Sequence, residues 1–301
     1  MKIRSLFAII NSVSSCPTSK LPTRLGHATV ALLTITTAES DGVCAAFDLK
    51  DDVGAYAVPQ SNKKNEYLLV MRRAPSQTNV VASVLVSKVI EDFRPNYLIL
   101  IGTAGGHSQR DELKLGDVVV ADYIDYSAYW KLTDGKFLER KHACDHPSLY
   151  LRETFAEILR RHPERWVHKL RLKRPDDSTP AVLMGAVVAG ELLLGDSNNA
   201  EQKRILDSYE KALAFEMESF GVARTVYSSR SSVHYNPQFL IIRGISDLVD
   251  KDPAENQNTR KVWTPLAIDA AATFAKALTE ALFDFETERA KEEGRTRWFR
   301  F

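Results

Sequence analysis

The feature that most constrains this chain is the alternation of short apolar segments with longer segments of helical spacing. The apolar segments are typical of buried strands and predict strands at 28–35, 67–71, 97–101, 117–121, 181–189 and 239–242. Helical spacing predicts helices at 79–93, 148–161, 200–209, 217–227 and 265–285. Strands that alternate with helices indicate one α/β domain around a mainly parallel or mixed sheet.

Three stretches lack this pattern. Residues 1–27 contain Pro, Ser and Thr without sustained periodicity, and we interpret them as an N-terminal arm. The charged residues 286–301 are expected to form a solvated tail. Residues 131–180 are charged, and a segment of this length could barely sustain a core of its own. We therefore expect a single domain over 28–285, with 131–180 as an elaboration on it.

The composition excludes several classes of protein. The 301 residues carry 40 Lys and Arg against 39 Asp and Glu, a formal charge of +1, which argues against a broad cationic surface for nucleic acid. No apolar run approaches the roughly 18 residues that span a bilayer, so no membrane partner is expected. Cys16, Cys44 and Cys144 are an odd number without metal-ligand spacing, which indicates a reducing compartment and a cytoplasmic protein.

Two of the segments that could carry chemistry lie where ligands bind in open α/β sheets, after a strand or at the start of a helix. Residues 102–106, Gly-Thr-Ala-Gly-Gly, would let backbone N–H groups approach a ligand closely, or they form only a tight turn. Glu216 or Glu218 could accept hydrogen bonds from the two hydroxyls of a ribose that packs on Met217, or the pair merely favours a helix N-terminus.

Two further carboxylates complete this set. Asp247 follows the strand at 239–242, where Ser246 could orient it to donate a proton, or it caps the next turn. Glu39 comes soon after the strand at 28–35, and taken alone such a residue is typical of solvated surface. No metal site is expected, because the histidines lack the spacing of a helical metal site; those considered are His107, His142 and His146.

Taken in chain order, these segments form a pattern that is more specific than any one of them. It comprises Ala38-Glu39, Gly102-Thr103-Ala104-Gly105-Gly106, Gly116-Asp117-Val118-Val119, Gly190-Glu191, Glu216-Met217-Glu218 and Ser246-Asp247. The pattern resembles the purine and uridine phosphorylase superfamily, and most closely its branch of 5′-methylthioadenosine/S-adenosylhomocysteine nucleosidases, over about residues 28–285 apart from much of 131–180. The resemblance implies a three-layer α/β/α sandwich with a twisted mixed sheet, a homo-oligomer, a small purine nucleoside or nucleotide as ligand, and no cofactor.

The resemblance also implies roles for individual residues. Asp247, with Ser246 beside it, would be the general acid at purine N7, and Glu39 would be the base that activates water. Binding roles would fall to Glu218 at the ribose hydroxyls, Met217 beneath the sugar, Thr103, Ala104 and Gly105 along the sugar and base, and Leu193 and Leu194 against the base. The family often has an aromatic residue at the last two positions, so we expect weaker stacking and a lower base specificity here.

The nucleophile separates hydrolysis from phosphorolysis. Phosphorylases of this superfamily carry an Arg immediately before the Gly-Thr/Ser segment and an arginine-bearing loop after the early strand. This chain has Ile101 at the first place and no Arg within 34–39 at the second. Both differences favour water, and so an N-ribosyl hydrolase (nucleosidase) for adenine nucleosides or nucleotides. The alternatives are a phosphate-dependent purine nucleoside phosphorylase and a catalytically inactive nucleoside- or nucleotide-binding sensor module.

Arg72 and Arg73 are candidates for binding the 5′ group of the substrate. They end one strand and precede a helix, a ready position for an anion, although a solvated Arg pair is equally common. If they bind the 5′-phosphates of a nucleotide, the range of substrates extends to ATP. Phosphorylase-like domains also resemble effectors of prokaryotic antiviral systems that strip adenine from nucleotides, which makes antiviral defence the corresponding expectation.

Overall fold

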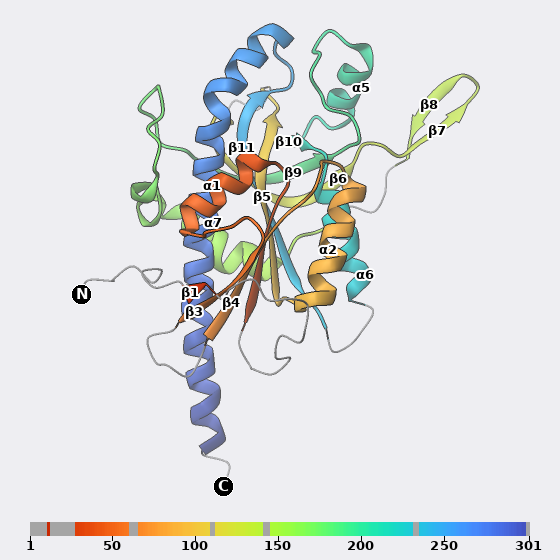
Figure 1. Cartoon of the computed structure of the whole chain (residues 1–301). Helices are drawn as coiled ribbons and strands as arrows, with labels where there is room; N and C mark the ends of the chain where they lie inside the picture. The colour runs from red at the N-terminus through yellow and green to blue at the C-terminus, as the bar shows by residue number, and fades with distance from the viewer. Residues whose placement is uncertain are drawn as a thin grey trace.

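A mixed sheet runs through the centre of the structure, a computed structural model that describes residues 11–12, 28–59, 66–108, 112–140, 145–230 and 235–298 (Figure 1). Within those ranges the sheet has nine strands: β1 (Asn11–Ser12), β2 (Thr29–Thr34), β3 (Gly54–Pro59), β4 (Glu66–Arg73), β5 (Tyr97–Gly106), β6 (Val118–Tyr126), β9 (Val182–Ala189), β10 (Ala212–Glu216) and β11 (Gln238–Leu248). Two more strands, β7 (Trp130–Thr133) and β8 (Lys136–Glu139), form a separate hairpin. Every strand predicted from an apolar segment is present.

The order of the strands brings distant parts of the chain side by side. It is β1-β3-β4-β2-β5-β10-β9-β6-β11, and β11 also pairs with β5. β2 runs parallel to β4 and β5, whereas β10 runs antiparallel to β5 and β6 runs antiparallel to β11. The expected mixed sheet is therefore confirmed. Its second half, from β5 through β10, β9 and β6 to β11, closes on itself because β11 returns to lie parallel to β5.

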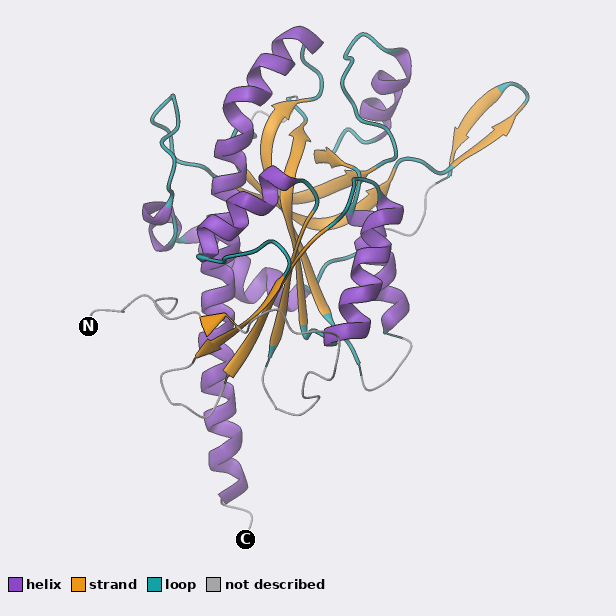
Figure 2. Ribbon diagram, in the orientation of Figure 1, coloured by secondary structure: helices purple, strands orange, loops and turns teal. Residues whose placement is uncertain are grey.

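Helices cover both faces of this sheet (Figure 2). α1 (Thr37–Phe47) and α7 (Pro253–Trp298) pack on one face, and α2 (Asn79–Phe93) and α6 (Ser219–Ser229) pack on the other. Burial follows the helical period: α2, for example, buries Ala82, Val86 and Val89, which lie along one side of the helix. The short helix α5 (Ala200–Ser208) packs near β9 and β10. This is the three-layer α/β/α architecture that the resemblance implied.

Close packing of the helices requires glycine at two positions. A Cβ on Gly221 of α6 would collide with the backbone carbonyl of Asn79 at the start of α2. A Cβ on Gly244 of β11 would collide with the backbone carbonyl of Ala267 in α7. Backbone atoms cannot swing aside as the end of a long side chain can, so these glycines let α6 lie against α2, and α7 against β11.

The last helix differs most from the prediction, because α7 extends beyond both predicted limits, 265 and 285. Glu286 is buried and accepts a hydrogen bond from the Tyr97 hydroxyl at 2.6 Å, and the hydroxyls of Thr287 and Tyr67 lie 2.8 Å apart. The first residues of the expected solvated tail therefore pack against β4 and β5 as part of the helix. Tyrosine hydroxyls of the sheet supply the buried partners that make this possible.

The expected elaboration over 131–180 begins within the β7–β8 hairpin and continues as short helical segments. These are α3 (Leu149–Leu151), a π-helical turn η1 (Arg152–Ala156), α4 (Glu157–Arg161), η2 (Pro163–Arg165) and η3 (Val167–Lys169), so the helix predicted at 148–161 is confirmed. Trp166 is fully buried with its ring edge-on to Phe274 of α7, at 5.4 Å between ring centroids. Arg174 is also buried and lies 3.5 Å from the Asp117 carboxylate. Residues 145–180 thus share the core of the main body.

Several predictions fall on parts of the chain that the structure does not describe. The N-terminal arm lies outside the described residues except for Asn11–Ser12, which pair with β3, and Cys16 and Cys144 lie outside them as well. Cys44 of α1 is a free, half-buried thiol. The division into arm, domain and elaboration stays a prediction. Among the described helices, none combines the length and the apolar character that crossing a bilayer requires.

Candidate active site

Acidic side chains gather where β2, β5, β10 and β11 end. Glu39 follows β2, Glu216 ends β10, and Asp247 lies near the end of β11. The register of the sheet brings two of these ends together: Gly105 of β5 pairs with Phe215 of β10 on one side and with Asp247 on the other. Because the sheet closes through β5 and β11, segments far apart in the sequence meet at one site.

Glu39 is held by the first turn of α1. Its carboxylate Oε2 accepts hydrogen bonds from the N–H groups of Ile35 and Thr36, at 3.2 and 2.9 Å, while the Thr36 hydroxyl accepts the N–H of Glu39. This reciprocal pair is a capping box. The other oxygen, Oε1, accepts the Thr103 N–H at 2.7 Å and lies 3.1 Å from the Thr103 hydroxyl. Glu39 is 3 % exposed, so the expectation for a lone surface Glu is wrong.

A fully buried arginine, Arg243 of β11, joins the carboxylates. Its Nη2 donates to Glu216 and lies 3.3 Å from Glu218 Oε2. A Cβ on Gly102 would collide with Arg243 Nη1 and with Glu39 Oε1, so both groups lie against the backbone of β5. Burial alone would lower the pKa of Arg243, but Glu216, Glu218 and Glu39 outweigh it and raise that pKa. The result is one permanent cation among three carboxylates.

Glu216 and Glu218 have different hydrogen-bond partners. The Glu216 carboxylate caps the start of α6, because it accepts hydrogen bonds from the backbone N–H groups of Glu218 and Ser219 at 3.1 and 3.0 Å. Glu218 makes no such cap, and its Oε1 lies 3.5 Å from the N–H of Thr78. Thr78 has φ 111°, a conformation that a residue with a side chain rarely adopts. Of the two alternatives drawn from the sequence, helix capping therefore describes Glu216, whereas ribose binding by Glu218 stays a prediction.

A β-bulge sets the orientation of the Asp247 side chain. The register between β11 and β5 shifts between Ile245 and Asp247, which makes Ser246 the extra residue and lets its hydroxyl donate to Asp247 Oδ1 at 2.6 Å. The other oxygen, Oδ2, accepts from Arg260 at 2.7 Å and from Asn256 at 3.2 Å, both in α7. Asp247 is 2 % exposed and belongs to this network, so the alternative that it caps the next turn is wrong.

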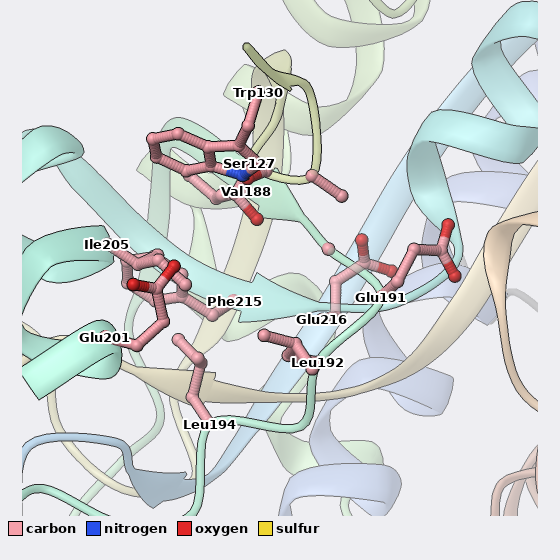
Figure 3. Close-up of a pocket in the computed structure, with 12 residues that line it drawn as sticks. Ser127, Trp130, Val188, Glu191, Leu192, Leu194, Glu201, Ile205, Phe215 and Glu216 are labelled. Carbon is pink, nitrogen blue, oxygen red and sulfur yellow. The ribbon is translucent and has the colours of Figure 1, made fainter. Parts of the chain in front are cut away.

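A pocket of about 160 Å³ lies beside these strand ends (Figure 3). Leu194 and Phe215 contribute apolar surface, and Glu216 lies at the end of the pocket that adjoins the acidic cluster. Trp130, where the β7–β8 hairpin begins, also lines the pocket, and the Arg204 guanidinium stacks over its ring at 3.5 Å from the centroid. Trp130 and Phe215 provide aromatic surface that the sequence at 193–194 lacks.

The remaining predicted binding residues divide into those the structure brings to this site and those it does not. Residues 102–106 are not a turn, because β5 continues to Gly106 and pairs with both β10 and β11. Within it, the Ala104 carbonyl oxygen lies 3.4 Å from the Ser246 hydroxyl oxygen. Met217 is half-buried between the two glutamates. Leu193 is 68 % exposed and does not line the pocket, whereas its neighbour Leu192 does.

Arg72 and Arg73 contact other groups. Arg72 donates to the carbonyls of Gly54 and Met71 at 2.8 and 2.7 Å, and Arg73 pairs with the Asp52 carboxylate. These contacts fix the start of β3 against the end of β4. Binding of 5′-phosphates by the two arginines stays a prediction, and it requires both side chains to leave these partners.

The charge on Glu218 gives a prediction for stability. Burial, followed by the nearby charge of Glu216, raises the pKa of Glu218 from 4.5 to about 7, against the opposing attraction of Arg243. A raised pKa means that folding favours the neutral form of Glu218. The stabilisation of the folded state by Glu218 is therefore complete below pH 4.5 and is lost as the pH rises through about 7. We expect urea unfolding to show wild-type stability falling relative to Glu218→Gln by up to about 3 kcal/mol across that range. A constant difference between the two proteins from pH 4.5 to 8 would contradict this account.

Three residues of the site are not predicted from the sequence. Arg243 interrupts an apolar strand, and a buried charge there was a signal that it has partners. Arg260 and Trp130 carried no signal, because only the fold brings α7 and the hairpin to the strand ends. Over the described ranges, no group of three His, Cys, Asp or Glu side chains could hold a metal ion.

Comparisons with known proteins agree on a family. The family model described as Phosphorylase superfamily matches residues 63–282. The chain is 30 % identical over 194 residues to "ATP nucleosidase Cap17" of Escherichia coli (strain KTE188), which covers 60 % of this chain and 36 % of that protein. It is 26 % identical over 171 residues to a 5′-methylthioadenosine/S-adenosylhomocysteine nucleosidase of Staphylococcus epidermidis, which covers 57 % of this chain and 65 % of that one. The chain therefore spans about a third of the first relative and just under two thirds of the second.

Solved structures show the same fold. The 5′-methylthioadenosine/S-adenosylhomocysteine nucleosidase of Neisseria meningitidis, in complex with methylthio-immucillin-A, superposes with a TM-score of 0.61 at 20 % identity. The match covers 84 % of this chain and 99 % of that one. At this identity the likeness supports the architecture of the sheet and its helices.

Proposed function

Because this chain belongs to the phosphorylase superfamily, we propose that it is an N-ribosyl hydrolase that cleaves the N-glycosidic bond of adenine nucleosides or nucleotides. The relatives named as nucleosidases of ATP and of 5′-methylthioadenosine support an adenine substrate and water as the nucleophile. Both relatives extend beyond the matched region.

The observation that carries the proposal is the carboxylate of Glu39, buried against Thr103 and Arg243. Phosphorolysis must hold an anionic phosphate next to the anomeric carbon. Here the buried cation beside Glu39, Arg243, is already shared among three carboxylates. A phosphate ion would meet net repulsion in a buried site, where charges are poorly screened, whereas water would not. The cluster therefore favours hydrolysis over the phosphorylase alternative.

The proposed mechanism needs an acid and a base on opposite sides of the bond. Cleavage passes through a transition state that resembles an oxocarbenium ion. Asp247 would protonate or hydrogen-bond the leaving purine at N7, with Ser246 orienting it, while Glu39 takes a proton from the attacking water. Glu218 would accept hydrogen bonds from the ribose hydroxyls, and the base would pack between the apolar and aromatic residues of the pocket. Since the Arg260 guanidinium contacts Asp247 Oδ2 in this structure, Arg260 must move before that oxygen can face the purine.

The 5′ group of the substrate is the least constrained part of the proposal. The nucleosidases and the ATP nucleosidase among the relatives differ in this group. Arg72 and Arg73 are the candidates for binding 5′-phosphates, and we propose with them an antiviral role, a homo-oligomer and a cytoplasmic location. The inactive-sensor alternative is disfavoured because every proposed catalytic group is present and hydrogen-bonded.

The substrate is tested by chromatography of reactions with adenosine, 5′-methylthioadenosine, AMP and ATP, each with and without phosphate. We expect free adenine from at least one of them at a rate that phosphate does not change. If the arginines bind phosphates, the Arg72→Ala/Arg73→Ala protein will show a raised KM for AMP and ATP with that for adenosine unchanged. Adenine release from none of the four, by folded protein, would support the sensor alternative instead.

A further inference from the structure

A second cavity lies between α7, Ala46 of α1 and residues 159–171 of the elaboration. Its volume is about 840 Å³, within the range of pockets that bind small molecules. Figure 1 shows this part of the elaboration, in green, beside α7, in blue. Thr273, one of the α7 residues that line it, lies about 20 Å along the helix from Arg260, at 1.5 Å per residue. We call this cavity the α7 groove.

Four of the twelve residues that line the α7 groove are cations, and they come from residues 165–171 and from α7. Arg165 ends η2, Lys169 ends η3, Arg171 follows η3, and Lys276 comes from α7. These four outnumber the acidic residues of the lining, one of which, Glu280, pairs with Lys169 at 2.7 Å. Cations that converge from separate elements around a hollow produce a positive potential inside it.

The two arginines differ from the two lysines in their partners. Both arginine side chains are exposed, and among the described residues neither guanidinium forms an ion pair, although the charge of Arg165 acts on its neighbour Glu164 and both Glu280 and Asp284 line the same groove. Elsewhere in the elaboration exposed arginines are paired: Arg160 and Arg161 both bind Glu157, at 2.6 Å. A guanidinium presents a planar fork of N–H donors that matches the oxygens of a phosphate group.

The wall between these cations is apolar and already buried. Leu159 is 4 % exposed, Ala277 is 5 % exposed and Ala46 is 7 % exposed, and all three line the α7 groove. Pockets of this kind, apolar with a few convergent polar groups, are typical of sites for organic ligands rather than for bare inorganic ions.

We propose that the α7 groove binds an organic phosphate at a site separate from the active site. Arg165 and Arg171 would contact the phosphate oxygens, and the organic part would lie on the apolar wall. This proposal does not depend on the activity of the active site, since it uses none of that site's residues.

The test is calorimetric titration with cytidine triphosphate, which carries phosphates and an organic part but lacks the purine N7 that Asp247 would protonate. We expect wild type and Asp247→Asn to bind it with the same Kd. In the double variant Arg165→Ala/Arg171→Ala that Kd should rise about tenfold or more. Inorganic tripolyphosphate should bind more weakly than cytidine triphosphate, because it lacks the base and ribose that would make further contacts within the groove.

The matched control removes two exposed cations of the same elaboration that do not line the groove. Arg161→Ala/Lys173→Ala loses the same charge, and its side chains pair with Glu157 and Asp177 instead. Its Kd should stay within about twofold of wild type, since exposed pairs contribute little. An equal loss of binding in both double variants, no binding to wild type, or displacement of cytidine triphosphate by adenosine would each overturn the proposal.

Discussion

Replacing Asp247 with Asn is expected to lower kcat for adenine release by about 10²–10⁴-fold. Asparagine has nearly the same shape, and its side-chain oxygen can still accept the Ser246 hydroxyl, so the bulge in β11 should persist. The amide has no carboxyl proton to give to N7, and it cannot form the ion pair with Arg260. KM should change much less than kcat, because the base contacts the pocket rather than this carboxyl alone. Initial rates at saturating substrate measure the loss.

Asp252→Asn is the matched control. Asp252 is exposed just before α7 and caps it through the N–H groups of Ala254 and Glu255, at 2.9 and 3.3 Å. Asparagine caps helices about as well as aspartate, so this variant should turn over like wild type. Wild-type kcat in folded Asp247→Asn would show that Asp247 is not the acid. A similar loss of kcat in Asp247→Asn and Asp252→Asn would show that the loss comes from altered packing of α7 and not from a missing acid.

Replacing Glu39 with Gln should also lower kcat by about 10²–10⁴-fold, because an amide cannot take the proton of the attacking water. The site offers a specific place for that water: the Thr103 hydroxyl on Oε1 can rotate away, whereas the backbone N–H groups cannot. Affinity for adenine should be retained, since Glu39 would face the nucleophile and not the base. A loss of kcat with retained adenine binding, measured by calorimetry, is the expected signature.

Stability must be followed in the same variant. In Glu39→Gln the side-chain amide nitrogen would face either the Thr103 N–H or those of Ile35 and Thr36, and a donor facing a donor is unfavourable. Asp41→Asn, exposed in the same helix, is the control and should match wild type in rate and in unfolding midpoint. Full turnover by folded Glu39→Gln would contradict the assignment of the base.

The apolar period of the sequence predicts the sheet well and the site only in part. The strands and α2 follow from local patterns, because a buried face needs apolar residues at a fixed spacing. The predicted start of α7 at Pro265 was wrong for a physical reason. Proline is common in the first turn of a helix, and nothing local indicates that twelve earlier residues, from Pro253, continue the same helix.

The position of the Glu39 side chain could have been predicted from the sequence. Thr36 and Glu39 have the spacing of a capping box, which marks the start of α1 and a Glu side chain turned back toward the strand. By contrast, the contact of Glu39 with Thr103, and that of Asp247 with Arg260, depend on how β5, β11 and α7 pack. No local pattern encodes such contacts, so the partners of the acidic cluster could be found only in the fold.

The most direct test of the central claim is the identity of the sugar released together with adenine. The wild-type protein is incubated with its preferred adenine substrate, with and without phosphate labelled with ¹⁸O, and the sugar product is analysed by mass spectrometry. Hydrolysis predicts an unlabelled sugar with a free hydroxyl at the anomeric carbon and equal rates in both buffers. Release of adenine only when phosphate is present, with labelled ribose 1-phosphate or its 5′-substituted form as the product, would contradict it.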